Sequence, residues 1–183
     1  SIKIFTYEKK KNEKLNILHV GRIVKGKGQV DAIKACDILI KNDIDFEFFI
    51  VGGYEDGYEE EFANFYKEIE YKDKIKFIGF TNEVNKYFVN ADIFLFPSYG
   101  EGFGNAFIEA ISFGCKAISY DNTTFKEFKE LGFDFNIVEN KNINPKWFDG
   151  HDLNVIKSRK NIAWIGVVRY FEVLDNILNS IVD

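Results

Sequence analysis

The residues best suited to bind a ligand or do chemistry lie in the stretch SYGEGFGNAFIEA at residues 98–110. It places three glycines within five positions, a carboxylate among them at Glu101 and a second carboxylate eight residues later at Glu109. A helix interior has no use for such glycines, because each one costs about 1 kcal/mol relative to alanine. Without side chains, however, backbone N–H groups can approach a sugar or a phosphate, and carboxylates accept hydrogen bonds from paired sugar hydroxyls. The stretch therefore indicates a ligand that comes close to the backbone.

The spacing of the two carboxylates excludes one common chemistry. A helix that begins near Phe103 or Gly104 would leave Glu101 just before its start and carry Glu109 two turns inside it. Eight helical residues rise about 12 Å, which exceeds the roughly 5–9.5 Å between the paired acids of a glycosidase. The two carboxylates suit the two ends of one extended ligand. Taken singly, each glutamate is better explained as an ordinary acid, one in a surface loop and one in a helix.

A second stretch, GRIVKGKG at residues 21–28, supplies positive charge. Arg22 would leave the end of a strand, and Lys27 would lie at the start of the next helix, where exposed N–H groups favour an anion. Arginine offers a bidentate fork to phosphate oxygens, and lysine offers a point charge. The stretch has neither the GxGxxG nor the Walker A pattern, which argues against a dinucleotide site or a P-loop. A solvated basic loop is the plain alternative, and only the position at a strand end argues against it.

Hydrophobic periodicity predicts the elements that would position these residues. The expected strands cover residues 15–21, 44–53, 74–80, 92–98, 115–120 and 135–138. The expected helices cover residues 26–42, 58–71, 82–91, 104–113 and 123–132, and a long amphipathic C-terminal helix covers 161–183. Strands that alternate with helices over short connections predict an α/β fold. We expect a Rossmann-like, doubly wound parallel sheet of about six strands with helices on both faces.

Ligands of such a sheet bind at the carboxyl ends of its strands, near the point where the strand order reverses. Four loops with glycines or charges should lie along this edge, at residues 21–28, 51–57, 79–82 and 98–110. Asp43 and Asp45 match the D-x-D pattern of metal-dependent glycosyltransferases, but they precede a strand and should lie at the opposite edge. We therefore expect no metal site there.

Length and composition narrow the remaining classes of protein and of site. The 183 residues suffice for one domain with a full core, and the net charge of −5 argues against nucleic acid as a partner. With only two histidines, a histidine-rich metal site is not expected. Cys36 and Cys115 are expected to be buried, reduced thiols. The chain has no methionine and begins at Ser1, so we expect a fragment, with residues 1–14 as a lead-in and 15–183 as the ligand-binding domain.

The motifs GRIVKGKG, FIGF and FPSYGEGFGNAFIEAISFG resemble the donor-binding, C-terminal half of family-four (group 1) retaining glycosyltransferases of the GT-B fold. The hallmark of that family is a glutamate, seven residues and a second glutamate, which reads here E-GFGNAFI-E. This pair alone is a weak pattern. Together with the upstream Arg-x4-Lys and the order of strands and helices, it is a strong one. The resemblance runs from about Leu15 to the final helix.

The resemblance implies a role for each of these residues. Arg22 and Lys27 would hold the diphosphate of a nucleotide-sugar and stabilise the departing nucleotide electrostatically. Glu101 would contact the donor sugar, so that Arg22, Lys27 and Glu101 form the catalytic set. Glu109 would bind the ribose hydroxyls. The backbone around the donor would be that of Gly21, Phe80, Thr81, Gly102, Phe103, Gly104 and Asn105, with residues 79–82 at the base.

The same resemblance implies an activity. A hexosyl group would pass with retention from a UDP- or GDP-sugar to a glycan or lipid-linked acceptor, in the assembly of a surface polysaccharide such as capsule or lipopolysaccharide. No metal or other cofactor would be required. We expect a cytoplasmic protein. For the longer parent protein, a second expected location is the inner face of the membrane, by peripheral association. The acceptor would bind another domain, so the isolated chain would bind the donor and transfer nothing.

Two features depart from the family pattern and leave alternatives open. Lys116 stands where members commonly have a proline, and residues 121–124 stand where they often carry paired glycines. A sugar-nucleotide epimerase or a phosphorylase-like protein would share the architecture, as would a non-catalytic nucleotide-binding module. A receiver-like signalling domain would need an acidic cluster at the end of the first strand, where Gly21 and Arg22 stand instead.

Overall fold

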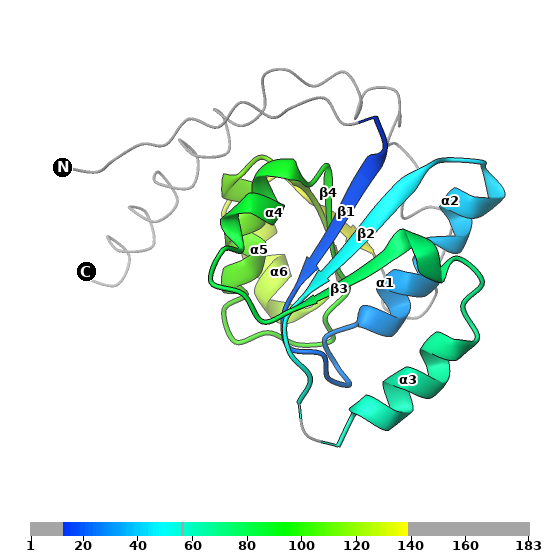
Figure 1. Cartoon of the computed structure of the whole chain (residues 1–183). Helices are drawn as coiled ribbons and strands as arrows, with labels where there is room; N and C mark the ends of the chain where they lie inside the picture. The colour runs from blue at the N-terminus through cyan, green and yellow to red at the C-terminus, as the bar shows by residue number, and fades with distance from the viewer. Residues whose placement is uncertain (1–12, 56, 139–183) are drawn as a thin grey trace.

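The computed structural model describes residues 13–55 and 57–138, which form one parallel sheet with helices on both faces (Figure 1). The elements in chain order are β1 Leu15–Val20, α1 Gln29–Ala35, α2 Asp37–Lys41, β2 Phe46–Val51, α3 Glu59–Lys67, the 3-10 helix η1 Lys72–Lys74, β3 Ile75–Gly79, α4 Asn85–Asn90, β4 Ile93–Phe96, α5 Asn105–Ser112, β5 Lys116–Tyr120, α6 Thr123–Glu130 and β6 Asn136–Val138. The predicted C-terminal helix over 161–183 lies outside the described residues, so that expectation stays a prediction.

The strand order is β3-β2-β1-β4-β5-β6, and every neighbouring pair is parallel. The order reverses between β1 and β4, where Ile17 pairs with Ile93. This arrangement confirms the predicted α/β class with its doubly wound, six-stranded sheet. It also places the loops that follow β1 and β4 side by side, at the point where such sheets bind ligands.

Two hydrophobic cores cover the two faces of the sheet. The first lies under α1, α2 and α3, and the second lies under α4, α5 and α6 (Figure 1). Successive side chains of a strand point to opposite faces, and accordingly Ile17 of β1 belongs to the first core and Leu18 to the second. The second core is rich in phenylalanine; the rings of Phe107 and Phe125 lie 4.4 Å apart between centroids. Each fully buried phenylalanine contributes about 1.5–3 kcal/mol.

The helix predicted over residues 26–42 is interrupted and begins later than expected. α1 starts at Gln29, since the Lys27 amide donates to Val24 O and closes a turn before the helix. Cys36 separates α1 from α2, and the amide of Leu39 donates to Cys36 O three residues back. Nothing in the apolar spacing marks this break. The predicted helix over 58–71 likewise ends at Lys67, before η1.

A close approach at Gly28 brings the loops after β1 and β4 together. Gly28 has a φ of 78°, and a Cβ placed on it would lie 2.0 Å from the carbonyl oxygen of Pro97. Only glycine therefore fits here. The amide of Tyr99 donates to Gly26 O at 2.9 Å and closes the contact. The two loops that carry Lys27 and Glu101 are thus held against each other by the backbone.

The prediction of two buried, reduced thiols is confirmed, and one histidine is buried as well. Cys36 and Cys115 are both buried and are not joined by a disulfide. His19 is fully buried in β1, where its Nδ1 lies 2.9 Å from the carbonyl oxygen of Leu95 in β4. Because a carbonyl only accepts, Nδ1 carries the proton in this pair. Burial lowers the pKa of His19 to about 4 from the ordinary value of 6.5.

This shift predicts a pH-dependent stability. Between pH 6.5 and about 4 the unfolded chain binds a proton at His19 that the folded chain does not. The contribution of neutral His19 is therefore fully present above pH 6.5 and is lost as the pH falls toward 4. We expect the free energy of unfolding, measured with urea, to fall by about 2–3 kcal/mol more in the wild type than in His19→Asn between about pH 7.5 and 4.5.

The asparagine variant keeps an amide donor toward Leu95 and cannot titrate, so the difference between the two proteins isolates His19. Carboxylates titrate alike in both proteins and cancel. Equal losses in the two proteins over this pH range would contradict the prediction.

Candidate functional site

A pocket of about 300 Å³ opens at the carboxyl ends of β1 and β4, where the strand order reverses. It is lined by Val20, Gly21, Arg22, Lys27, Phe96, Glu101, Phe103, Gly104, Asn105 and Ala106. The structure thus brings the two predicted cations and one predicted carboxylate to one cavity. These residues come from two segments about 75 positions apart in sequence, which the pairing of β1 with β4 unites.

An ion pair between Lys27 and Glu101 lines this pocket. The Lys27 Nζ is 2.6 Å from the Glu101 Oε1, and the side chains are 23% and 8% exposed. A carboxylate so nearly buried needs a partner, because removing a charge from water is costly. The pair therefore holds Glu101 in one place and keeps an ammonium group in the pocket that the start of α5 also lines.

Arg22 is the more exposed of the two cations that line the pocket. Its Nη1 is 2.7 Å from the Oε2 of Glu55, with side-chain exposures of 69% and 45%. Exposed pairs of this kind contribute little to stability, so Arg22 remains available to an anion. The predictions named no role for Glu55, although its loop, residues 51–57, was among those expected at this edge. The Arg22 backbone is fixed by Gln29, whose Nε2 donates to Arg22 O at 2.7 Å.

Asp31 holds the loop between β4 and α5 from the side, and no feature of the sequence pointed to this role. Its Oδ2 accepts a hydrogen bond from the Tyr99 hydroxyl at 2.6 Å and another from the Tyr120 hydroxyl at 2.7 Å. The bond to Asp31 raises the pKa of Tyr99. Burial, together with the same acceptor, raises the pKa of Tyr120. Both hydroxyls therefore stay protonated donors at neutral pH.

The fold needs only one of the three glycines in this loop. Gly104 has a φ of 76° at the start of α5, and a Cβ there would lie 3.3 Å from the ring of Phe125. A Cβ placed on Gly100 or Gly102 would meet nothing within 4 Å, and neither residue has a positive φ. The chain's own packing does not explain these two glycines.

Four predicted site residues do not line the pocket. Glu109 lies on α5 one turn beyond Asn105 and Ala106, on the face that those residues turn to the pocket. The residue as a whole is exposed, yet partial burial of its carboxyl group raises the pKa of that group. Gly102 lies within the loop itself and is exposed.

Phe80 and Thr81 follow β3, which β2 separates from β1. The Phe80 side chain is 82% exposed. Gly79 just before it accepts a hydrogen bond from the Gly52 amide at 2.9 Å, so this loop lies on the same edge of the sheet. The roles proposed for these residues remain predictions.

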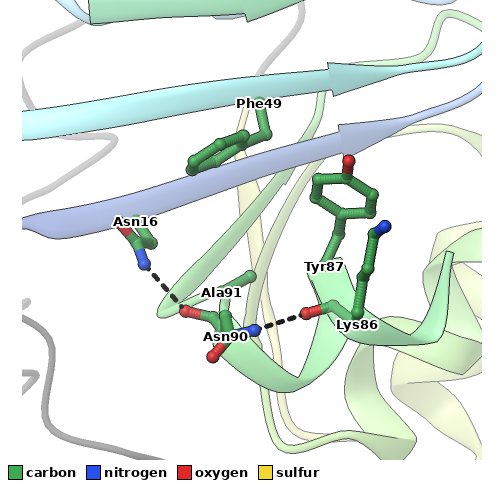
Figure 2. A pocket seen from close by; sticks show the side chains of 6 residues that line it. All are labelled: Asn16, Phe49, Lys86, Tyr87, Asn90 and Ala91. Carbon is green, nitrogen blue, oxygen red and sulfur yellow. Dashed lines mark hydrogen bonds between the residues drawn. The ribbon is translucent and has the colours of Figure 1, made fainter. Parts of the chain in front are cut away.

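A second pocket of about 300 Å³ lies at the amino ends of β1 and β4 (Figure 2). It is lined by Asn16, Phe49, Lys86, Tyr87, Asn90 and Ala91. Its amides bond to its own backbone: Asn16 Nδ2 donates to Asn90 O at 3.2 Å, and Asn90 Nδ2 donates to Lys86 O at 2.6 Å. None of the predicted site residues lies there. We therefore place the candidate site in the first pocket, where charged groups converge.

Two further observations concern metals and membranes. Within residues 13–55 and 57–138, no cluster of three or more His, Cys, Asp or Glu side chains could hold a metal ion. Asp45 of the D-x-D stretch precedes β2, at the edge opposite the pocket as expected, and is paired with Lys74 at 2.7 Å. In the part of the chain described, no helix is both long enough and apolar enough to span a membrane.

Known proteins share this fold. The chain is similar to UDP-bound HepE from Anabaena, with a TM-score of 0.66 at 19% identity over 92% of this chain and 48% of that one. It is also similar to the C-terminal domain of a group 1 glycosyl transferase, LpcC, from Francisella tularensis. That match has a TM-score of 0.65 at 22% identity and covers 88% of this chain and 85% of that one.

Sequence relatives are glycosyltransferases as well. The chain is 33% identical over 137 residues to an uncharacterized glycosyltransferase of Haemophilus influenzae, covering 73% of this chain and 37% of the relative. It is 28% identical over 159 residues to the capsular polysaccharide biosynthesis glycosyltransferase CapH of Staphylococcus aureus, covering 84% and 43%. The chain thus spans less than half the length of these relatives. Since the family described as glycosyl transferases group 1 matches residues 2–145, the chain belongs to that family.

Proposed function

We propose that this chain is the donor-binding domain of a retaining glycosyltransferase, and that its pocket holds the diphosphate and sugar of a UDP- or GDP-sugar. The observation that carries the proposal is the convergence of Arg22, Lys27 and Glu101 at the carboxyl ends of β1 and β4. The two cations offer positive charge to a diphosphate. The start of α5, which lines the same pocket, offers backbone N–H groups. A carboxylate next to them offers acceptors to sugar hydroxyls.

The proposed mechanism is electrostatic. As the bond between sugar and diphosphate breaks, negative charge grows on the departing nucleotide, and fixed cations stabilise that charge without having to reorganise. Lys27 is pre-positioned by Glu101 at 2.6 Å, and the Arg22 backbone is held by Gln29 at 2.7 Å. Glu109, one turn along α5, would reach the ribose hydroxyls. The backbone at Phe80 and Thr81 would meet the base.

Other parts of the proposal rest on similarity. HepE has been crystallised with UDP, and CapH takes part in capsular polysaccharide biosynthesis. By analogy we propose transfer of a hexosyl group to a glycan or lipid-linked acceptor in surface polysaccharide assembly, without a required metal. The acceptor site, the location at the cytoplasmic side of a membrane and the inactivity of the isolated chain belong to this proposal. The relatives favour a transferase over an epimerase or a non-catalytic module.

A matched pair of lysines tests the pocket. Lys25 and Lys27 lie two residues apart in one loop and carry the same charge, but only Lys27 lines the pocket, and Lys25 is 82% exposed. We expect Lys27→Ala to weaken binding of UDP or GDP by about tenfold to a hundredfold, because a charge-assisted bond to phosphate is lost. Lys25→Ala should change the affinity by less than about twofold. Isothermal titration calorimetry measures both.

The panel of ligands in that titration is UDP, GDP, UDP-glucose, UDP-N-acetylgalactosamine and GDP-mannose. Equal losses in the two lysine variants would indicate bulk attraction, and absence of binding across the panel would refute the donor site. Equal affinity of the wild type and Glu109→Ala for the UDP-sugars would favour the non-catalytic module.

One of the two glycines that the fold does not need gives a second test. A Cβ at Gly102 meets no atom of the chain within 4 Å, so Gly102→Ala should change the free energy of unfolding by less than about 0.5 kcal/mol. The same Cβ should collide with a bound donor and cost about 1–3 kcal/mol of binding energy. Gly53→Ala is the control, because a Cβ there also meets nothing and Gly53 lies in the loop after β2, not in the loop that carries Glu101. Calorimetry and urea unfolding read out the two quantities; unchanged donor binding by Gly102→Ala would contradict the assignment.

A further inference from the structure

The first turn of α6 is hydrogen-bonded to the loop that carries Glu101. The side chain of Asn122 begins the helix by accepting from the Phe125 amide at 3.1 Å, while its Nδ2 donates to Ser98 O at 3.0 Å. The Thr124 hydroxyl donates to Glu101 O at 2.7 Å. Two side chains of one helical turn therefore bind both ends of residues 98–101, which we call the acidic loop.

The other contacts of the acidic loop leave its backbone little freedom. The Tyr99 amide donates to Gly26 O at 2.9 Å, and the Ser98 hydroxyl donates to Gly100 O at 3.1 Å. With the Thr124 bond, the carbonyls of Ser98, Gly100 and Glu101 each accept a side-chain hydrogen bond. The orientation of the Glu101 peptide decides where its carboxylate points. Of these bonds, the Thr124 bond is the one that reaches Glu101 itself.

We propose that Thr124 is a positioning residue: its hydroxyl fixes the backbone of Glu101 so that the carboxylate meets Lys27 and the sugar half of the donor. This inference rests on the proposed function. It concerns residues 121–124, where the sequence departs from the paired glycines of the family pattern. A glycine at 124 has no side chain and could not donate this bond. The contact is therefore a feature of this chain's own residues.

Single substitutions separate the hydroxyl from the shape of the side chain. Thr124 is 9% exposed, and Thr124→Val keeps its size but removes the donor from a part-buried carbonyl. Thr124→Ser keeps the hydroxyl and should rescue. Thr123→Val is the matched control, since Thr123 is the exposed neighbour in the same turn. Thr124→Ala serves as a second variant without the hydroxyl, should the valine variant fold poorly.

The first readout needs no ligand. Amide hydrogen exchange of residues 99–104 in the full 183-residue chain reports how firmly the acidic loop is held. We expect Thr124→Val and Thr124→Ala to speed exchange in this segment by about threefold to tenfold, in line with one lost hydrogen bond. Thr124→Ser and Thr123→Val should exchange like the wild type.

The second readout separates a role in donor recognition from a general loss of stability. The probes are the panel sugar-nucleotide that binds the wild type most tightly and the matching nucleoside diphosphate. We expect Thr124→Val to weaken the sugar-nucleotide by about threefold to tenfold while leaving the diphosphate within about twofold. Glu101→Gln should shift the same ratio in the same direction, and Thr124→Ser should restore it.

The outcomes are distinct. Wild-type exchange together with a wild-type affinity ratio in Thr124→Val overturns the inference. If Glu101→Gln lowers the ratio and Thr124→Val does not, the inference fails while the proposed function stands. If no member of the panel binds the wild type, the proposed function and the donor role of Thr124 both fall, and the exchange rates alone decide whether Thr124 holds the acidic loop.

Discussion

The site depends on one backbone contact, the approach of Gly28 to Pro97. Its closeness follows from a missing side chain: a Cβ at Gly28 would lie 2.0 Å from the Pro97 carbonyl oxygen. The contact joins the loops after β1 and β4, and the ion pair of Lys27 with Glu101 bridges the same loops. The parallel pairing of β1 with β4 sets the approximate distance, and the absent side chain sets the final one. The attraction between Lys27 and Glu101 then sets how their side chains lie across the two loops.

The cations of the site are already paired within the protein. Lys27 is paired with Glu101 and Arg22 with Glu55, at 2.6 and 2.7 Å. These pairings keep unlike charges close in an acidic protein of net charge −5. A phosphate that enters must share each cation with a carboxylate, so the binding energy is smaller than two bare cations would give. Glu101 in turn keeps Lys27 ordered before any ligand arrives.

The sheet could be read from the sequence because burial on both faces leaves a plain signal. The run IFLF is apolar throughout and LNILHV is mostly apolar, as is typical of central parallel strands. The glycines and charges at 21–28 and 98–110 then fall on one edge by topology alone. The break at Cys36 could not be read, because it changes no apolar spacing and follows from local turn bonds.

The hydrogen bonds that hold the loops could not be predicted from the sequence, for a different reason. Asp31 meets Tyr99 and Tyr120 across 68 and 89 positions, and Thr124 meets Glu101 across 23. The identity of a single hydroxyl or carboxylate does not reveal which distant residue it will bond to. Such contacts appear only once the chain has been folded.

The sheet's order also affects how the chain must be made. β1 pairs with β2 and with β4, and the contact of His19 with Leu95 spans 76 positions. During synthesis the first three strands are complete before β4 emerges, and until then the backbone N–H and C=O groups along one edge of β1 have no partner strand. A nascent chain at that stage exposes an open strand edge of the kind that chaperones shield. The pocket itself comes into being only when β4 closes that edge.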